Sequence, residues 1–299
     1  MGVADAVLLL ANVIYGTTFA ATRVVLDAVP PATLALTRLG IAAIVLVPFA
    51  RSPMRESFSR ADHGRLAAMG VVGFAGAVAL GHWGLARSTA TNAALLIVIE
   101  PLTLLVLGPL LLGESLNVRE RVGAACAVAG ALLVVVNGVP GVNVAVAPHW
   151  RGDVLLVLSG MAYAAYSLLA RPVLARHRAL PVTLASLLWS LPALAPFALA
   201  EWLSGRRPAW TLSTVVATVL LGVIATALGF VVWNWALERV TAAHAAIFLN
   251  IQPVVGAAVG VAVLGEAWNA FTALGGLLVM AGLTLTVRRA ASVAVYSET

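Results

Sequence analysis

The sequence predicts an all-α membrane protein of ten transmembrane helices, built as two inverted five-helix repeats. Three observations support this prediction: an apolar composition, ten apolar segments of membrane-spanning length, and an internal repeat. Hydrophobic residues make up 62% of the chain and charged residues only 10%, whereas soluble domains carry about 25% charged residues. The mean hydropathy of +1.01 therefore indicates that lipid is the solvent for most of the chain.

Each of the apolar segments approaches the roughly 20 residues that cross a hydrocarbon core. They are 5–25, 31–50, 64–85, 90–112, 119–137, 152–171, 180–200, 211–233, 241–264 and 269–287. The first segment carries Asp5 and has no basic residues before it, so we expect a membrane helix rather than a signal peptide. We expect residues 1–137 and 152–289 to form the repeats, 138–151 a linker and 290–299 a cytoplasmic tail.

The basic residues, all of them arginines, indicate how the chain is oriented. With a cytoplasmic N-terminus, twelve arginines fall in the inner loops and the tail, and the outer loops hold only Arg23, Arg87, Arg151, Arg206 and Arg207. Cytoplasmic loops of membrane proteins are enriched in basic residues. We therefore expect both termini in the cytoplasm of a bacterium, with the chain in the inner membrane. Because the arginines lie at segment ends and not on one face, no nucleic-acid partner is expected.

The chain repeats itself at nearly constant offsets. At an offset of 152, Glu100-Pro101 aligns with Gln252-Pro253, and Gly113-Glu114 aligns with Gly265-Glu266. Nearer the N-terminus the offset is 148, as between Tyr15 and Tyr163. Five spans per repeat is an odd number, so the second copy enters the membrane from the opposite side. Inverted repeats are an architecture of transporters, in which the substrate site lies near the midplane between the halves.

These duplicated motifs resemble the drug/metabolite transporter superfamily, specifically its ten-helix EamA type. The resemblance rests on Pro101, Gly113-Glu114, Gly123 and Gly130, and on their mates in the second half, Pro253, Gly265-Glu266, Gly275 and Gly282. It covers nearly the whole chain. The resemblance implies secondary transport of a small metabolite by alternating access without ATP, and amino-acid exporters are among the members of similar layout. It leaves the substrate open.

Glu100 is the clearest candidate for a functional residue. It lies about ten residues into its predicted span, or about 15 Å at 1.5 Å per residue, which is near the midplane. An ionisable side chain inside hydrocarbon is a functional hypothesis by default, because its desolvation is expensive. Glu100 could bind a substrate amine, carry a coupling proton, or be the buried partner of Arg38 in the second predicted span; these readings can coexist.

Helical geometry extends the candidate site around Glu100. At 100° per residue, one face of the fourth span carries Asn92, Leu96, Glu100 and Thr103. The matching face of the ninth span carries His244, Phe248 and Gln252. We expect both stripes to border one central cavity, to which Tyr15 and Tyr163 contribute from the first and sixth spans, although helix-to-helix hydrogen bonding or packing would also explain each of these residues.

Three further residues complete the candidate set. His82 could line an outer vestibule. Pro101 and Pro253 interrupt the hydrogen bonds of their spans and are candidate hinges for alternating access.

The leading interpretation is a secondary transporter that exports small amphipathic metabolites, with amino acids as the leading substrate class. The alternative is an intramembrane enzyme acting on a lipid or isoprenoid, which would need several acids or histidines at one depth. The sequence contains neither phosphate-loop nor His-Glu-x-x-His motifs, and its one cysteine, Cys126, cannot make a cysteine metal site. We therefore expect no cofactor and no metal. The expected partners are a small-molecule substrate and the lipid bilayer, with a proton as the candidate coupling ion; monomer and dimer stay open.

Overall fold

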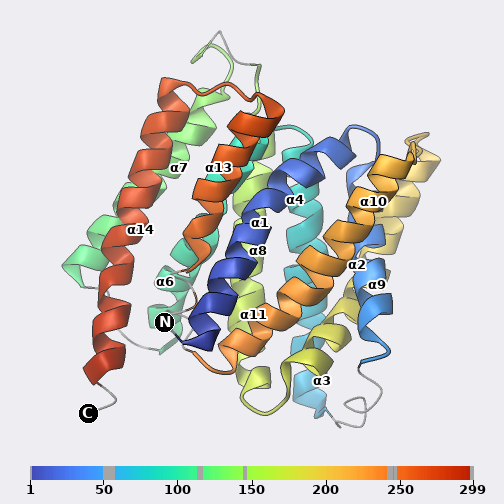
Figure 1. Cartoon of the computed structure of the whole chain (residues 1–299), viewed down its shortest axis with the longest axis horizontal. Helices are drawn as coiled ribbons and strands as arrows, with labels where there is room; N and C mark the ends of the chain where they lie inside the picture. The colour runs from blue at the N-terminus through green and yellow to red at the C-terminus, as the bar shows by residue number, and fades with distance from the viewer. Residues whose placement is uncertain are drawn as a thin grey trace.

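The computed structural model describes residues 2–49, 58–112, 117–143, 147–240, 245 and 248–296, and these residues form ten helical segments packed side by side (Figure 1). The single helices include α1 (Val3–Leu26), α2 (Pro31–Leu46), α7 (Val118–Asn137) and, at the start of the second half, α8 (Trp150–Leu174). The remaining segments are α3–η2–α4 (60–85), α5–α6 (90–112), α9 (Ala179–Leu203), α10–η3–α11 (212–237), α13 (Ile251–Leu264) and α14 (Ala270–Tyr296).

Seven of these helices are long and apolar enough to cross a membrane, and three shorter apolar helices, Pro31–Leu46, Ile251–Leu264 and Ala270–Leu285, accompany them. Large apolar side chains are exposed around the bundle, for example Leu203 at 80%, Leu212 at 82% and Val263 at 71%. Water would not tolerate so much apolar surface, whereas lipid does. The chain is therefore a multi-pass membrane protein, as the sequence predicts.

The bounds of the helices repeat along the chain. The segment 60–85 returns as 212–237, and α6 (Ile99–Leu112) returns as α13 (Ile251–Leu264), both displaced by 152 residues. Even the irregularities repeat: the π-helical segments η2 (Met69–Gly76) and η3 (Leu221–Leu228) lie at this same displacement. π-Helical insertions are rare and are frequent at functional sites. The helices therefore follow the internal repeat seen in the sequence.

Repeat mates pack directly on each other at several places in the described part of the chain. Helix α2 contacts α9, and α7 contacts α14 at the edge of the bundle (Figure 1). Glycines allow the close approach of the second pair, since a Cβ added to Gly130 would lie 2.5 Å from the carbonyl oxygen of Gly275, and one added to Gly282 would lie 2.5 Å from Gly123 O. The glycines of the duplicated motif therefore serve helix packing.

Glycines of the segment 60–85 have the same role. An added Cβ would lie 2.4 Å from Ser186 O at Gly70 and 2.8 Å from Gly152 O at Gly84. The segment 60–85 can therefore pack closely against both α8 and α9, which brings its residues to the centre of the bundle.

Two carboxylates of the second half cap helices of the first half. Glu201 in α9 accepts hydrogen bonds from the amides of Ala32 and Thr33, both 2.9 Å, at the start of α2. Glu266 accepts from the amides of Ala90 and Thr91, at 2.6 and 2.7 Å, at the start of α5. Negative charge is favourable at a helix N-terminus, where backbone N–H groups lack partners.

The position of Glu266 explains the Gly-Glu motif of this half. Gly265 ends α13 with a φ of 66°, a left-handed conformation that glycine adopts without strain. The chain then turns, and the next residue reaches α5. Glu114, the repeat mate of Glu266, lies outside the described residues.

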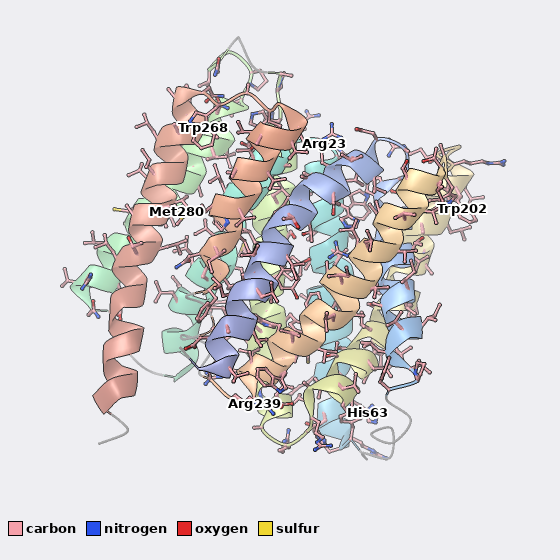
Figure 2. All side chains as sticks on the ribbon, viewed as in Figure 1. Arg23, His63, Trp202, Arg239, Trp268 and Met280 are labelled. Atoms are coloured by element: carbon pink, nitrogen blue, oxygen red, sulfur yellow. The ribbon has the colours of Figure 1, made fainter. Side chains whose placement is uncertain are left out.

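Labelled side chains mark the two ends of the bundle. Arg23, Trp202 and Trp268 lie near one end, uppermost in Figure 2, and His63 and Arg239 lie near the other. Helix α1 begins, and α14 ends, near the end that carries His63 and Arg239 (Figures 1 and 2). Compared with the expected boundaries, α8 begins slightly earlier, and α14 continues to Tyr296 through part of the expected tail.

Candidate functional site: a central cavity

A cavity of about 110 Å³ lies between helices of the two halves. Its walls come from α1, α2, α4, the α5–α6 segment, α8, α11 and α13. The residues that line it are Tyr15, Thr18, Phe19, Thr22, Arg38, Val78, Gly81, His82, Ala93, Ile97, Glu100, Leu156, Ser159, Tyr163, Tyr166, Ser167, Phe230, Trp233, Leu249 and Gln252. Apolar atoms make up most of the wall's surface, as is usual for small-molecule sites, but more than half of these residues also carry a polar group. Arg38 and Glu100 are ionisable groups of opposite sign.

Six of the residues singled out from the sequence line this cavity. They are Tyr15, Arg38, His82, Glu100, Tyr163 and Gln252. They come from six different segments, so the fold gathers them from positions as distant in sequence as 15 and 252.

The other four described candidates lie elsewhere. Leu96 is fully buried in an apolar cluster with Ala93 and Val134, and Phe248 packs on the largest apolar cluster. Thr103 is half-buried on α6 without lining the cavity. Asn92 belongs to a polar network described below. His244 falls outside the described residues.

A break in the fourth span explains why the face that lines the cavity differs from the predicted face. Helix α5 ends at Leu96 and α6 begins at Ile99, so the face that lines the cavity consists of Ala93, Ile97 and Glu100. The expected face assumed one continuous helix through the break. Pro101 lies in the first turn of α6, where its missing N–H is tolerated, and Pro253 lies at the start of α13, which follows a turn at Asn250. Each hinge candidate therefore adjoins an interruption of its span.

Glu100 is placed in the cavity by this break and by close packing of α8. Its amide donates to the carbonyl of Ile97 at 2.9 Å, and a Cβ added to Gly160 of α8 would lie 3.3 Å from that amide. The residue is only 7% exposed. Ser167 lies beside its carboxylate, but the Ser167 hydroxyl has no partner in hydrogen-bonding geometry. Among the described residues no ion pair reaches Glu100.

Arg38 forms no ion pair with Glu100 among the described contacts, although such a pair is one of the alternatives that the sequence leaves open. Its Nε donates to the hydroxyl of Thr226 at 2.6 Å, and the Thr226 hydroxyl donates in turn to Leu221 O at 3.0 Å. This second bond spans five residues and belongs to the π-helical segment η3, whose wider turn places Thr226 against α2. Arg38 is also 7% exposed, so the cavity wall holds a basic and an acidic side chain that are not paired with each other in the part of the chain that the structure describes.

His82 lies deeper than a vestibule residue would. It is 4% exposed, and its Nδ1 lies 3.2 Å from the carbonyl oxygen of Pro31 at the start of α2. Its Nε2 is buried without a hydrogen-bond partner. Buried polar atoms without partners are uncommon and call for an explanation.

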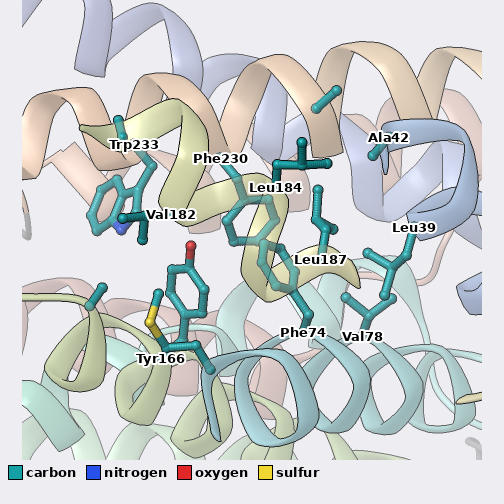
Figure 3. Close-up of a cluster of buried hydrophobic side chains, with 14 of the residues drawn as sticks. Leu39, Ala42, Phe74, Val78, Tyr166, Val182, Leu184, Leu187, Phe230 and Trp233 are labelled. Carbon is teal, nitrogen blue, oxygen red and sulfur yellow. The ribbon is translucent and has the colours of Figure 1, made fainter. Parts of the chain in front are cut away.

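Aromatic rings form one wall of the cavity. Phe230 is stacked on Tyr163 with ring centroids 6.4 Å apart, and it meets Tyr15 and Tyr166 edge-on at 6.4 and 5.6 Å. Figure 3 shows Phe230 beside Phe74, with Tyr166 directed toward the same cluster. Glycine makes room for one tyrosine, since a Cβ added to Gly229 would lie 2.5 Å from the hydroxyl oxygen of Tyr15.

Helix α8 contributes more side chains to the cavity than the sequence predicts. Ser159, Tyr163, Tyr166 and Ser167 line the cavity, and their spacing of three to four residues places them on one helical face. That periodicity was a usable signal in the sequence. Asn12 was also missed: its side chain accepts a hydrogen bond of 2.7 Å from Gln252 Nε2 and thereby fixes the orientation of that amide.

Asn92 joins a buried polar network near the start of α8. His149 Nδ1 lies 2.6 Å from the carboxylate of Asp153, Ser88 donates to the same carboxylate, and Asn92 Nδ2 lies 3.3 Å from it. These side chains are at most 8% exposed. The network ties the start of α5 to α8, which is a structural role.

Comparisons with known proteins agree with this architecture. The profile of the EamA-like transporter family matches residues 2–136 and again 150–288, once for each half. The chain is 31% identical over 283 residues to a protein of Streptantibioticus cattleyicolor named "Probable terminal-alkyne amino-acid exporter", covering 94% of this chain and 92% of that one. It is 25% identical to a "Probable amino-acid metabolite efflux pump" of Salmonella typhimurium, covering 93% of each.

A solved structure shares the fold. A crystal structure with 20% sequence identity aligns with a TM-score of 0.66 and covers 96% of this chain and 97% of that one. At this identity the likeness concerns the fold alone.

Proposed function

The chain belongs to the EamA-like transporter family, and we propose that it exports small amphipathic metabolites, with amino acids as the leading substrate class. In this proposal the substrate occupies the central cavity, which opens alternately to the two sides of the membrane without ATP. The names of the relatives from Streptantibioticus cattleyicolor and Salmonella typhimurium support export and amino acids as the substrate class.

One observation carries the proposal: Glu100 faces the cavity without an ion-pair partner among the described residues. A buried charge without a partner is costly, and inside a membrane protein such residues mark substrate or ion pathways. A substrate amine is a suitable partner, because a carboxylate forms strong charge-assisted hydrogen bonds with it. A coupling proton would neutralise the same group.

The repeated helix bounds support alternating access. Because each half has five spans, the second half of the proposed arrangement is inverted, and the pairs α2–α9 and α7–α14 lie near a pseudo-twofold axis in the membrane plane. Exchange of the two halves' conformations would then open the cavity to one side and close it to the other. The breaks beside Pro101 and Pro253 provide places where the spans can bend.

We propose the bacterial inner membrane as the location, with both termini in the cytoplasm. Among the described side chains, eight arginines belong to segments assigned to the cytoplasmic side, against five on the opposite side. The eight are Arg60, Arg65, Arg119, Arg121, Arg171, Arg176, Arg178 and Arg239. The alternative function, an intramembrane enzyme, is disfavoured by the family and by the names of these relatives.

A counterflow assay in proteoliposomes tests the proposal. Purified protein loaded with unlabelled amino acid should accumulate the labelled one from a panel of neutral amino acids. Glu100→Gln should lower exchange by about 10-fold or more, because a charge-assisted hydrogen bond to the substrate is lost. Gln252, the repeat mate, shows that an amide fits this environment in a span, so the variant should insert and fold. Normal exchange by a well-folded Glu100→Gln protein would refute this role of Glu100.

A further inference from the structure

The cavity holds an acid and a base that do not neutralise each other. Arg38 on α2 and Glu100 on α6 both line it and are both 7% exposed, yet no ion pair joins them in the part of the chain that the structure describes. Opposite charges buried in one protein usually pair, because an unpaired buried charge is expensive. Here each side chain keeps its capacity to bind another group.

The contacts of Arg38 determine which of its atoms are available. Nε is occupied by Thr226, whereas neither Nη atom donates a hydrogen bond to any described residue. A guanidinium group presents its donors as a rigid planar fork that matches a carboxylate in bidentate geometry. With Nε held, the two Nη atoms form the free end of that fork, and the residue lines the cavity.

Two tyrosines line the same cavity as Arg38 and Glu100: Tyr15 from α1 and Tyr163 from α8. Their rings meet Phe230 at centroid distances of 6.4 Å, so the cavity that holds both ionisable side chains has an aromatic wall. A ligand that spans the charges would therefore place its apolar part against these rings.

We propose that Arg38 is a carboxylate-binding subsite, so that the transported molecule is a zwitterion held by Arg38 at its carboxylate and by Glu100 at its amine. This inference rests on the proposed function and narrows its substrates to neutral α-amino acids with apolar side chains. Simple amphipathic amines, which lack the carboxylate, are excluded from the preferred substrates. A zwitterion satisfies both buried charges at once, and neither a cation nor an anion does so.

Three probes separate the two ends of the site: L-leucine, isopentylamine, which is leucine without its carboxylate, and 4-methylpentanoate, which is leucine without its amine. Wild-type protein in proteoliposomes should exchange L-leucine at least about 10-fold faster than either analogue. In Arg38→Gln, leucine exchange should fall about 10- to 100-fold, since a hydrogen bond to a charged group is lost. Exchange of isopentylamine should stay within about twofold of wild type.

The control is Arg23→Gln, because Arg23 pairs with Asp27 at the end of α1 and does not line the cavity. This variant should behave as wild type with all three probes. Arg38→Lys should restore part of the leucine exchange, since an ammonium group keeps the charge but not the planar fork.

The outcomes distinguish this inference from the function on which it rests. If wild type exchanges none of the probes, both the amino-acid function and the inference are refuted. If wild type exchanges leucine and isopentylamine equally, or if Arg38→Gln lowers both to the same extent, the carboxylate subsite is refuted while transport of amphipathic molecules stands. Should the Arg38 variants fail to fold, the wild-type ratio of leucine to isopentylamine decides, and a ratio near one overturns the inference.

Discussion

Arg38 in the second span donates its Nε–H to the hydroxyl of Thr226 in the eighth span over 2.6 Å. The bond joins the first half of the chain to the second, and it holds the guanidinium group at the wall of the cavity. Thr226 lies in a π-helical segment and donates its own proton to Leu221 O. A local irregularity of one helix thus fixes the orientation of a charged side chain on another.

Loss of the hydrogen bond between Arg38 and Thr226 should weaken transport. Thr226→Val removes the acceptor of Arg38 Nε and leaves a buried donor unpaired, which costs about 1–3 kcal/mol. We expect a lower thermal unfolding temperature in detergent and a raised KM for exchange. Thr226→Ser keeps the hydroxyl and is the matched control, expected to stay close to wild type. Equal behaviour of Thr226→Val and Thr226→Ser would mean that the hydrogen bond contributes nothing.

Gly229 controls the position of Tyr15. In Gly229→Ala the new Cβ would lie 2.5 Å from the Tyr15 hydroxyl oxygen, so the ring must move within the cavity. Because only the end of a side chain is displaced, we expect the unfolding temperature to change little and KM to rise several-fold. Gly40→Ala is the control, since nothing lies within 4 Å of its added Cβ; a similar effect of both substitutions on KM would contradict the assignment of Tyr15 to the site.

The carboxylate of Glu266 should stabilise the start of α5. Glu266→Ala removes the acceptor of two backbone amides and a favourable charge at a helix N-terminus, for a loss of about 1–2 kcal/mol. The thermal unfolding temperature of the purified protein should therefore fall. Asp27→Asn removes a carboxylate that is exposed and paired only with Arg23, and it should have almost no effect. If Glu266→Ala unfolds at the same temperature as wild type, the cap is unimportant.

The number of helical segments and the internal repeat of their bounds could be predicted from the sequence, because both depend on local pattern. Apolar segments of about 20 residues mark helices wherever they pack, and the offset of 152 between Pro101 and Pro253 reappears in the bounds of α6 and α13. Glu100 could be found because burial of an acid in an apolar segment is costly regardless of its neighbours.

The partners of the site residues could not be predicted, because they depend on contacts between distant segments. Arg38 and Glu100 lie at similar predicted depths in their spans, but depth does not determine which way a helix face points. Arg38 Nε donates to Thr226 and forms no described ion pair with Glu100. The sequence predicts Leu96 on the cavity face of the fourth span, whereas Ile97 lines the cavity in the structure. This difference has a local cause. A break of two residues before α6 rotates the two half-helices relative to each other, and helical periodicity cannot be extended through it.

Thiol labelling of the fourth span tests most directly whether the central cavity is the substrate site. Ile97→Cys and Leu96→Cys, each in a Cys126→Ala background, place a thiol on adjacent residues of which only the first lines the cavity. A water-soluble thiol reagent added to proteoliposomes during exchange should label the Ile97→Cys protein but not the Leu96→Cys protein. A transported amino acid should slow labelling of the Ile97→Cys protein. Labelling of Leu96→Cys while Ile97→Cys stays unreactive, or labelling of Ile97→Cys that no transported amino acid affects, would contradict a central cavity as the substrate site.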